Sequence, residues 1–302
     1  MKYCAIDVGS NSVRHLLVEQ EPDGVLLYRG SSSVITRITE GSSQGRLVLK
    51  EAAVKRTLDA IRGVRSIMEA EGVSRNNCFL FATESLRMAE NSCQVKRMLE
   101  AEAGVPAELL SGTREAQLGL KGVSCSFGPD TTTFDLGGGS LEISTEGLSL
   151  SFPLGAVRMT NRFGEQPREI EKDVIFHIEP EVPHLKGQLV GVGGTSSSVI
   201  MMNEGIPINS YAPYLVHGKK ATLDSLDSLL SLLMGPRVDR QKITGLEPLR
   251  SDIIVAGISV IRAVLKVFHV EEYIHSETGI LWGVVLEKLQ ERGLSIRDIA
   301  FE

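Results

Sequence analysis

The sequence predicts an α/β protein made of two lobes that share one plan. Three observations support this prediction. The chain has 302 residues, a length that suits about two domains better than one. Strand and helix patterns follow the same order in both halves. A short motif, Asp-x-Gly-x-x-Ser, occurs at 7–12 and again at 135–140.

The composition is typical of a globular protein, and the net charge limits the kinds of partner that the protein can bind. Hydrophobic residues make up 42% of the chain and charged residues 23%, with a net charge of -6. That charge argues against sequence-independent nucleic-acid binding, which requires a broad basic face. It still permits a local polyanion site, because backbone N–H groups and a few arginines can make one cleft positive on an acidic protein.

Cysteine usage and hydropathy bear on location. The four cysteines, Cys4, Cys78, Cys93 and Cys125, are far apart and form no CxxC pair. We therefore expect reduced thiols in a cytoplasmic protein, without a disulfide or a zinc site. Residues 1–8 lack the basic start and long apolar stretch of a signal peptide, and the longest apolar run is too short to span a bilayer. No membrane role is expected.

The first lobe begins with strands, and its helices follow. Apolar, β-prone runs flank the motif at 7–12, and a third run follows the turn-prone Pro22-Asp23-Gly24. Apolar residues then recur at helical spacing from Val54 to Met68, and Gly72 suits the end of that helix. We expect strands at 2–7, 13–19 and 24–30, a helix at 51–71, a strand at 77–82, a helix at 84–102 and another from about 113.

The second lobe repeats this order with additions. We expect strands at 131–136, 141–145 and 148–154, a helix at 168–182, a strand at 187–192 and a helix from 195 to 202. Helices at 222–234 and 252–268, a strand at 271–276 and a last helix at 279–292 follow. Because a final helix often folds back on the first lobe, we expect domains of 1–123 with about 283–302, and of 124–282.

The two motifs have the composition of a phosphate-binding loop. Each lies between two strands, and its glycines permit positive φ angles and the close approach of a ligand to the backbone. Successive N–H groups in such a turn bind anions, and hydroxyls from Ser10, Ser12 and Ser140 add donors. A single copy is equally well explained as a tight β-turn. Two copies at equivalent places favour a ligand that both lobes hold.

The aspartates of these loops indicate a cation. Asp7 and Asp135 would repel phosphate unless a metal ion lies between carboxylate and phosphate, and Mg²⁺ prefers such oxygen ligands. Glu142 follows Ser140 by two residues, which places both on one face of a strand. We expect Glu142 to orient a metal-bound or attacking water.

A third glycine-rich stretch, at 189–198, runs from a strand through Gly193-Gly194 into a helix that Thr195 opens. Free N–H groups at a helix amino terminus attract anions. A glycine-permitted turn with a threonine cap explains the same residues equally well. The sequence has no GxxxxGK[ST] motif, which excludes a P-loop protein.

Together these segments resemble the exopolyphosphatase/guanosine pentaphosphate phosphohydrolase (Ppx/GppA) family of the acetate and sugar kinase, Hsp70 and actin superfamily. "AIDVGSNSVR" is similar to the first phosphate loop of that family and "TFDLGGGSLE" to the second. Five more segments follow in the family's order, so the resemblance extends over essentially the whole chain: "FATESLRMAEN", "LLSGTREAQLGLKGV", "FPLGAVRMT", "GVGGTSSS" and "SDIIVAGISVI".

The resemblance implies two ribonuclease H-like (actin-like ATPase) domains with an interdomain cleft. It also implies Mg²⁺-dependent hydrolysis of the terminal phosphoryl group of inorganic polyphosphate, or of pppGpp to ppGpp. Glu115 matches the catalytic glutamate, whereas by itself it would be an acid in the first turn of a helix. Arg87 matches an arginine that contacts phosphate, and by itself would be a solvated cation. The expected phosphate ligands are Gly9, Ser10, Asn11, Ser12, Arg87, Gly137, Gly138, Gly139, Ser140, Gly193, Gly194 and Thr195, and the expected metal ligands are Asp7, Asp135 and Glu142.

Three departures from the family pattern bear on the substrate. Arg114 replaces the first of two consecutive glutamates, where it could pair with Glu115 and lower its basicity. Leu141 replaces a threonine after the glycines, and the segment 276–283 lacks the usual arginines. Arg14, Arg37 and Arg158 are further candidates for polyanion contacts, although each by itself is better explained as a surface or interlobe residue.

The sequence leaves two other functions open. One is a regulatory protein that binds a guanosine or adenosine polyphosphate and turns it over poorly. The other is a phosphotransferase that moves phosphate between polyphosphate or ATP and an acceptor. The expected partner in each case is a polyphosphate or nucleotide, with no nucleic acid and no membrane, and a homodimer is the default oligomer.

Overall fold

A computed structural model describes residues 1–41, 47–182, 184–185, 187–235 and 238–301. The chain divides into two compact units, one of Met1–Ser126 with Ile280–Glu302 and one of Phe127–Gly279. The domain limits expected from the sequence, 123 and 283, lie three residues from these divisions. In the part of the chain that is described, no helix is both long enough and apolar enough to cross a membrane.

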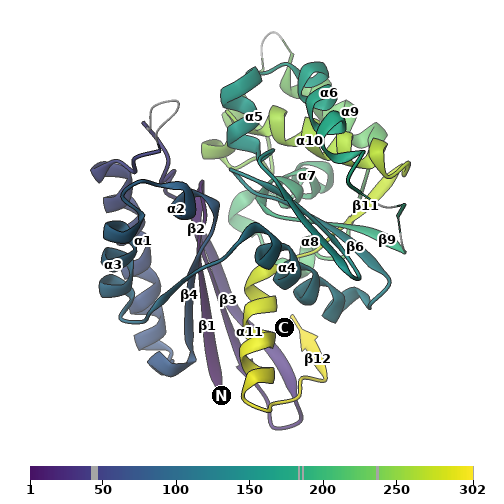
Figure 1. Cartoon of the computed structure of the whole chain (residues 1–302). Helices are drawn as coiled ribbons and strands as arrows, with labels where there is room; N and C mark the ends of the chain where they lie inside the picture. Colours follow the sequence, from purple (N-terminus) through teal and green to yellow (C-terminus); the bar gives the residue numbers. More distant parts are fainter. Residues whose placement is uncertain (42–46, 183, 186, 236–237, 302) are drawn as a thin grey trace. The chain divides into compact units, whose positions relative to one another are not determined.

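Unit 1 is a mixed sheet with helices on both faces (Figure 1). Its strand order is β12-β3-β2-β1-β4-β5. The strands are β1 (Lys2–Val8), β2 (Ser12–Gln20), β3 (Val25–Ile35), β4 (Cys78–Ala82), β5 (Ala107–Leu109) and β12 (Asp298–Ala300). The helices are α1 (Glu51–Ala70), α2 (Glu84–Met88), α3 (Ser92–Ala103), α4 (Gly112–Phe127) and α11 (Ile280–Glu291).

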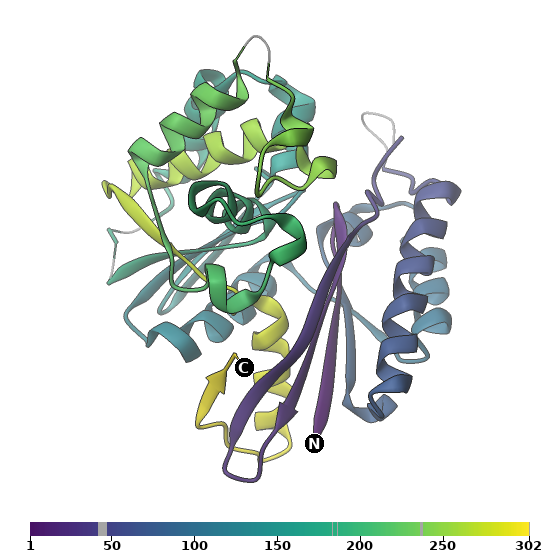
Figure 2. The same cartoon turned by 180° about the vertical axis from the view of Figure 1, so that it is seen from behind.

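Alternation along β1 explains why both faces of this sheet are covered. Cys4 and Ile6 lie in the core that includes α1 and α3, whereas Tyr3 and Ala5 lie in the core that includes Trp282 of α11. A strand that is apolar on both sides requires a helix layer on each side. Figure 2 shows the C-terminal strand β12 beside the β3 end of the sheet, where it pairs in parallel with β3.

Unit 2 has the strand order β10-β11-β9-β6-β7-β8. Its strands are β6 (Thr131–Leu136), β7 (Leu141–Thr145), β8 (Leu148–Phe152), β9 (Gln188–Val192), β10 (Lys220–Thr222) and β11 (Glu272–His275). Its helices are α5 (Ala156–Phe163), α6 (Pro167–Ile178), α7 (Gly194–Glu204), α8 (Pro213–Val216), α9 (Leu223–Leu233) and α10 (Ile254–Val267).

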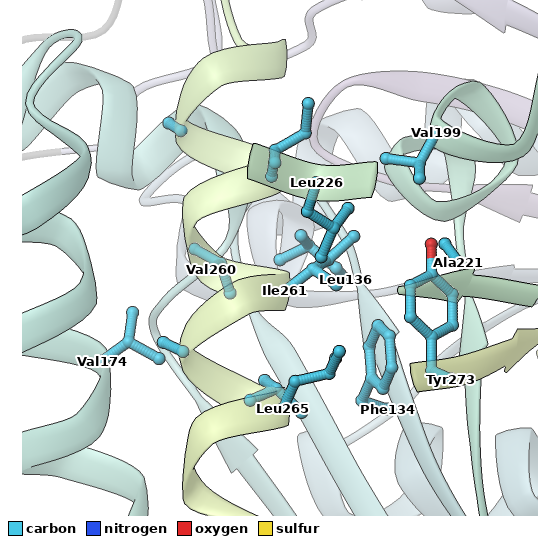
Figure 3. Close-up of a cluster of buried hydrophobic side chains, with 14 of the residues drawn as sticks. Phe134, Leu136, Val174, Val199, Ala221, Leu226, Val260, Ile261, Leu265 and Tyr273 are labelled. Carbon is cyan, nitrogen blue, oxygen red and sulfur yellow. The ribbon is translucent and has the colours of Figure 1, made fainter. Parts of the chain in front are cut away.

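The core of unit 2 is built around α10, which is buried on nearly all sides (Figure 3). Phe134 of β6 meets Tyr273 of β11 edge to face, with ring centroids 5.1 Å apart. Leu136 follows Phe134 by two residues and joins the same core. Asp135 lies between them on the strand, so its side chain projects from the opposite face.

The duplication predicted from the sequence is confirmed by the topology. The series β3-β2-β1-β4-β5 in unit 1 corresponds to β8-β7-β6-β9-β11 in unit 2. In both units the first two strands are antiparallel and joined by a motif loop, and the next pair is parallel.

Some predicted elements differ from the structure. The helix expected at 84–102 is two helices, α2 and α3. Between them, the Asn91 side chain accepts from the backbone N–H of Leu49 and donates to its carbonyl. Asn91 thereby connects the start of α3 to the segment that precedes α1. The helix expected at 168–182 ends earlier, at Ile178. Five short elements were not predicted from the sequence: α5, α8, β5, β10 and β12.

We expect Gly283→Ala to destabilise unit 1. A Cβ at Gly283 would lie 1.8 Å from the backbone oxygen of Leu118, so α4 and α11 would have to separate. Overpacking of this kind costs about 1–3 kcal/mol or more of unfolding free energy. Thermal unfolding followed by circular dichroism measures the loss.

The matched control is Gly63→Ala on the exposed side of α1, where a new Cβ would meet no described atom within 4 Å. This change should raise the unfolding free energy by up to about 1 kcal/mol, because alanine is the better helix former. Equal melting temperatures for the two variants would contradict the tight crossing.

Candidate functional site

The predicted site residues of unit 1 lie at one edge of its sheet. Val8, the last residue of β1, pairs with Ala82, the last residue of β4, and Ala82 pairs with Leu109 at the end of β5. The three parallel strands therefore end together. Each continues into a segment with predicted site residues: the loop Gly9–Ser12 after β1, Arg87 after β4 and Glu115 after β5.

Glu115 and Arg87 are neighbours. The Arg87 guanidinium lies 3.6 Å from Oε2 of Glu115, whose side chain is 12% exposed. Arg87 also donates to the backbone oxygen of Leu110, just before α4 begins. Glu115 lies in the first turn of α4, where the backbone N–H donates to the carbonyl of Ser111. Arg87 of α2 thus contacts both Glu115 and the residue that precedes α4.

Arg114 does not pair with Glu115, contrary to the expectation from its sequence position. Its guanidinium forms an ion pair with Glu287 of α11 instead. Adjacent residues on a helix point in different directions, and the partner on α11 holds Arg114 away. The arginine that replaces a glutamate here therefore contributes to packing within unit 1.

Buried polar atoms without a protein partner gather at the same edge of unit 1. Among the described residues they include both side-chain amide atoms of Asn11, Oγ of Ser85, Oγ1 of Thr36 and Oδ1 of Asp7. Asn11 is only 6% exposed. A buried polar atom left unsatisfied costs about 1–3 kcal/mol. Several such atoms beside one loop indicate a polar ligand or ordered water rather than a purely structural turn.

Asp7 is compensated by an arginine. Arg14, its register partner on β2, donates to Oδ2 of Asp7 from Nε at 2.9 Å and from a terminal nitrogen at 2.5 Å. The Asp7 side chain is 2% exposed. Arg14 thus engages one carboxylate oxygen and neutralises its charge, while Oδ1 has no partner among the described residues. The metal role of Asp7 stays a prediction.

The motif loop of unit 2 repeats the geometry of the first. The N–H of Gly9 donates to the Ser12 carbonyl at 3.0 Å, and the N–H of Gly137 donates to the Ser140 carbonyl at 3.0 Å. The glycines of both loops have no positive φ, which corrects the expectation from the sequence. A Cβ at Gly9 would lie 3.3 Å from the carbonyl oxygen of Ser12, which is a tight contact, and a Cβ at Gly137 would lie 3.5 Å from that of Ser140.

Helix α5 fixes the orientation of the second loop. N–H groups of Ala156, Val157 and Arg158 donate to the carbonyls of Gly137 and Gly138, and Gly155 donates to Gly139. The N–H of a trans peptide points opposite to its carbonyl. The N–H groups of Gly138, Gly139 and Ser140 therefore point away from α5. Such a row of N–H groups is an anion-binding nest.

The short distance between α5 and the loop explains why residue 155 is a glycine. A Cβ at Gly155 would lie 2.4 Å from the backbone of Gly138 and Gly139. Arg158 adds a second tie, because its Nε donates to the carbonyl of Gly139 at 3.0 Å. Only a glycine at 155 lets the first turn of α5 come close enough to bind the loop carbonyls.

Asp135 and Glu142 form a pair of carboxylates at this loop. They are register partners on β6 and β7 and project from the face opposite the core of unit 2. Ser151 Oγ donates to Oε1 of Glu142 at 2.7 Å. Directly opposite residues have Cβ atoms about 4.5–5.5 Å apart, so like charges repel. In unit 1 the position of Glu142 is taken by Arg14.

This pair fits Mg²⁺ as a partial set of ligands. Across the described ranges, no group of three or more His, Cys, Asp or Glu side chains could hold a metal ion. Mg²⁺ in phosphate-binding sites is commonly held by one or two carboxylates, with waters and substrate oxygens completing the shell. The carboxylates of Asp135 and Glu142 match that pattern.

The third glycine-rich stretch adjoins the second loop. Asp135 pairs with Val192 at the end of β9, and a Cβ at Gly193 would lie 2.9 Å from Oδ1 of Asp135. Gly193 has a φ of 95°, which an L side chain rarely adopts. Helix α7 begins at the next residue, so the start of α7 lies beside the Asp135 carboxylate.

Arg250 is a site residue that the sequence analysis missed. A Cβ at Gly194 would lie 2.4 Å from the Arg250 guanidinium, so this cation lies against the first turn of α7. A positive charge at a helix amino terminus adds to the attraction for anions. The only signal in the sequence is that Arg250 directly precedes the family-like segment at 251–261.

A polar cluster lies beside α7, beyond the glycines. Nε2 of His275 lies 2.9 Å from Oε1 of Glu277, and the backbone N–H of Glu277 donates to Nδ1 of His217 at 3.1 Å. Burial and the nearby His275 lower the pKa of His217 to about 4, against a smaller opposing effect of Glu277. Burial, the largest single effect, acts to raise the pKa of Glu277. The hydrogen bond from His275, its electrostatic attraction, and hydrogen bonds from Tyr211 and Ser197 together outweigh burial, so the pKa of Glu277 is lowered.

Comparison with known proteins identifies the family. The chain matches the Ppx/GppA phosphatase family over residues 17–292. The chain belongs to this family. The predicted family is thus confirmed, and the predicted enzyme class is confirmed to the level of a phosphatase family.

Individual relatives extend the comparison. A bifunctional 3-dehydroquinate synthase/phosphatase of Fusobacterium nucleatum is 28% identical over 95% of this chain, which spans 46% of that protein. Exopolyphosphatase 1 of Mycobacterium tuberculosis is 27% identical over 96% of this chain and 88% of its own length.

Solved Ppx/GppA structures share the fold. The Aquifex aeolicus family member is 25% identical, with a TM-score of 0.78 over 98% of this chain and 99% of that one. An exopolyphosphatase from Cytophaga hutchinsonii, 23% identical, gives a TM-score of 0.81 over 96% of this chain and 98% of that one. The predicted class of two actin-like α/β domains is confirmed.

We expect Glu142→Gln to remove Mg²⁺ sensitivity. Without metal, the variant should gain about 0.2–1 kcal/mol of unfolding free energy, because a repulsive carboxylate pair is relieved. Adding Mg²⁺ should raise the melting temperature of the wild-type protein and not that of the variant. The control is Glu146→Gln in the exposed β7–β8 turn. If Glu142→Gln retains the full Mg²⁺ shift, the carboxylate pair is not the metal site.

We expect His217 to make the protein sensitive to mild acid. The folded protein keeps His217 neutral down to a pKa of about 4, whereas the unfolded chain takes up the proton below about 6.5. The unfolding free energy should therefore fall as pH drops from about 6.5 to 4, by up to about 3 kcal/mol, and be unaffected by this group above 6.5.

Denaturant titrations of the wild type and His217→Gln measure this effect. Glutamine retains an acceptor for the Glu277 N–H, and the slope between pH 4 and 6.5 should become shallower. The exposed His184 supplies the control substitution, His184→Gln. An unchanged slope in His217→Gln would mean that other groups cause the acid sensitivity.

Proposed function

We propose that the protein is an exopolyphosphatase that releases orthophosphate from the end of inorganic polyphosphate with Mg²⁺ as cofactor. One observation carries the proposal: the outward N–H groups of Gly138, Gly139 and Ser140 lie beside the Asp135–Glu142 carboxylate pair. An anion nest next to a carboxylate pair suits a phosphate that binds together with a divalent cation.

The names of relatives support this substrate class. The Mycobacterium tuberculosis relative is named an exopolyphosphatase, and the Fusobacterium nucleatum relative includes a phosphatase. We extend the proposal to pppGpp as a second substrate, because its terminal phosphoryl group presents the same anhydride and the same charged oxygens. The expected location is the cytoplasm.

Binding would use the backbone at both motif loops. N–H groups of the 137–140 loop and the first turn of α7 would donate to phosphoryl oxygens of the substrate, with Arg250 adding positive charge. In unit 1, the unpartnered amide of Asn11 offers both a donor and an acceptor. That both loops hold the same chain of phosphates remains a prediction.

Glu115 would act as the general base. In the proposed step, a water oxygen bonds to the terminal phosphorus as the bridging P–O bond breaks, and the shortened chain leaves with that oxygen. The water proton passes to the Glu115 carboxylate and then to solvent. Arg87, 3.6 Å from Glu115, would fix the orientation of the carboxylate.

Mg²⁺ bound by Asp135 and Glu142 would supply positive charge that neutralises phosphoryl oxygens. The protein groups would supply the rest of the catalysis by positioning and by charge stabilisation, since phosphoryl transfer needs little covalent help from the enzyme. Glu142 itself is held by Ser151, so its direction is set before any ligand binds.

A panel of substrates separates this proposal from its alternatives. The assay would measure phosphate release from polyphosphates of graded length, pppGpp and ATP, with and without Mg²⁺. Tight binding without release would favour a regulatory protein. Transfer of the terminal phosphate to ADP or another acceptor would favour a phosphotransferase.

We expect Glu115→Gln to reduce phosphate release by about a hundredfold or more, the scale of general-base catalysis. Glutamine keeps the size of the side chain, so the fold and the affinity for polyphosphate should be retained. The control is Glu108→Gln, an exposed glutamate on β5 in the same unit. Comparable rates for the two variants would remove Glu115 from the mechanism.

A further inference from the structure

A chain of buried polar side chains connects the first turn of α7 to β11. Ser196, 0% exposed, donates from Oγ to the Tyr273 hydroxyl at 3.2 Å and lies 2.8 Å from Nδ1 of His275. Tyr273 and His275 are each 1% exposed and share one face of β11. Nε2 of His275 faces the Glu277 carboxylate, which can only accept, so Nε2 donates.

This chain of polar side chains also reaches Ser197, the next residue of α7. The Glu277 carboxylate accepts hydrogen bonds from the side chains of Ser197 and Tyr211. The backbone N–H of Glu277 is fixed by His217. Two consecutive residues of α7, Ser196 and Ser197, are therefore tied to the end of β11 and the residues that follow it.

Other contacts leave the start of α7 little freedom. A Cβ at Gly257 of α10 would lie 2.6 Å from Cγ2 of Thr195, so α10 packs directly on this residue. The Arg250 guanidinium covers Gly194. Gly193, Gly194 and Thr195 thus lie between packed neighbours on one side and the polar chain on the other.

Stability alone does not account for this arrangement. Replacing buried polar and charged groups by apolar ones of similar volume is often neutral or stabilising. At the corresponding junction in unit 1, the described residues show no comparable chain: β4 leads into the five-residue helix α2, and Oγ of Ser85 has no partner among them. This chain of buried polar side chains belongs to unit 2, the unit that contains the Asp135–Glu142 carboxylate pair.

We propose that Ser196, Tyr273, His275 and Glu277 are positioning residues that hold the first turn of α7 in the orientation that binds phosphate. The inference rests on the proposed function and assigns to β11 a role in substrate affinity. Hydrogen bonds to preorganised N–H groups lose strength when the donors can tilt, because each phosphate then has to order them on binding.

The test compares two serines of α7. Ser196→Ala removes the connection to β11. Ser198→Ala is the matched control, because Ser198 is also buried but its Oγ donates only to the carbonyl of Gly194 within the helix. The probe is inorganic tripolyphosphate with Mg²⁺, titrated by calorimetry, and KM and kcat for polyphosphate are measured alongside.

Ser196→Ala should weaken tripolyphosphate binding about three- to tenfold and raise KM by a similar factor, the scale of one hydrogen bond, with kcat changed less. Ser198→Ala should stay within about twofold of the wild type. Equal melting temperatures for the two variants would show that the difference is not one of stability.

Tyr273→Phe is a second variant if Ser196→Ala fails to fold. It removes only the hydroxyl and keeps the ring contact with Phe134, and the same loss of affinity is expected. Glu277→Gln, which keeps an oxygen for Nε2 of His275, should bind more tightly than Glu277→Ala. Wild-type affinity and KM in Ser196→Ala and Tyr273→Phe would overturn the inference.

Failure of the two proposals can be told apart. A wild-type protein that binds tripolyphosphate but releases no phosphate contradicts the proposed activity, and the binding comparison then still decides the role of Ser196. A wild-type protein that releases phosphate, with variants of unchanged affinity, contradicts the positioning role alone. A wild-type protein that binds no tripolyphosphate contradicts both.

Discussion

The candidate site depends on the hydrogen bonds between the first turn of α5 and the carbonyls of the 137–140 loop. These bonds use N–H groups that a helix otherwise leaves unsatisfied. They also orient the loop peptides so that the carbonyls point toward α5 and the N–H groups point away from it. The donors of the loop then face outward as a group. Gly155 makes this possible, because any larger residue there would separate α5 from the loop.

The two motif loops have the same backbone but opposite charge partners. Asp7 faces Arg14 across the first hairpin, whereas Asp135 faces Glu142 across the second, at the same register. One change of residue type thus turns a neutralised aspartate into a carboxylate pair that favours a cation. The duplicated hairpins therefore provide similar backbone donors, while the second hairpin places two carboxylates opposite each other, an arrangement that suits a metal ion.

Much of the fold and of the site follows from local patterns, and the rest depends on distant partners. The paired motifs, most strands and the long helices could be predicted, because glycines and apolar periodicity mark them. The ion pair of Arg114 with Glu287 could not, since its partners are 173 residues apart. The same holds for Asn91, whose side chain bonds to Leu49 across 42 residues, and for the Arg250 guanidinium against Gly194.

The course of the chain through unit 1 bears on how the protein folds during synthesis. Trp282, Val285 and Leu289 of α11 complete the core around Tyr3 and Ala5, to which Leu118 of α4 also belongs. This helix layer of unit 1 is therefore incomplete until residues 280–291 have left the ribosome. Unit 2 is continuous, from Phe127 to Gly279, and its residues emerge earlier. Domains generally fold as units. Unit 2 can therefore reach its native structure during synthesis before unit 1, whose core is incomplete until α11 has been made.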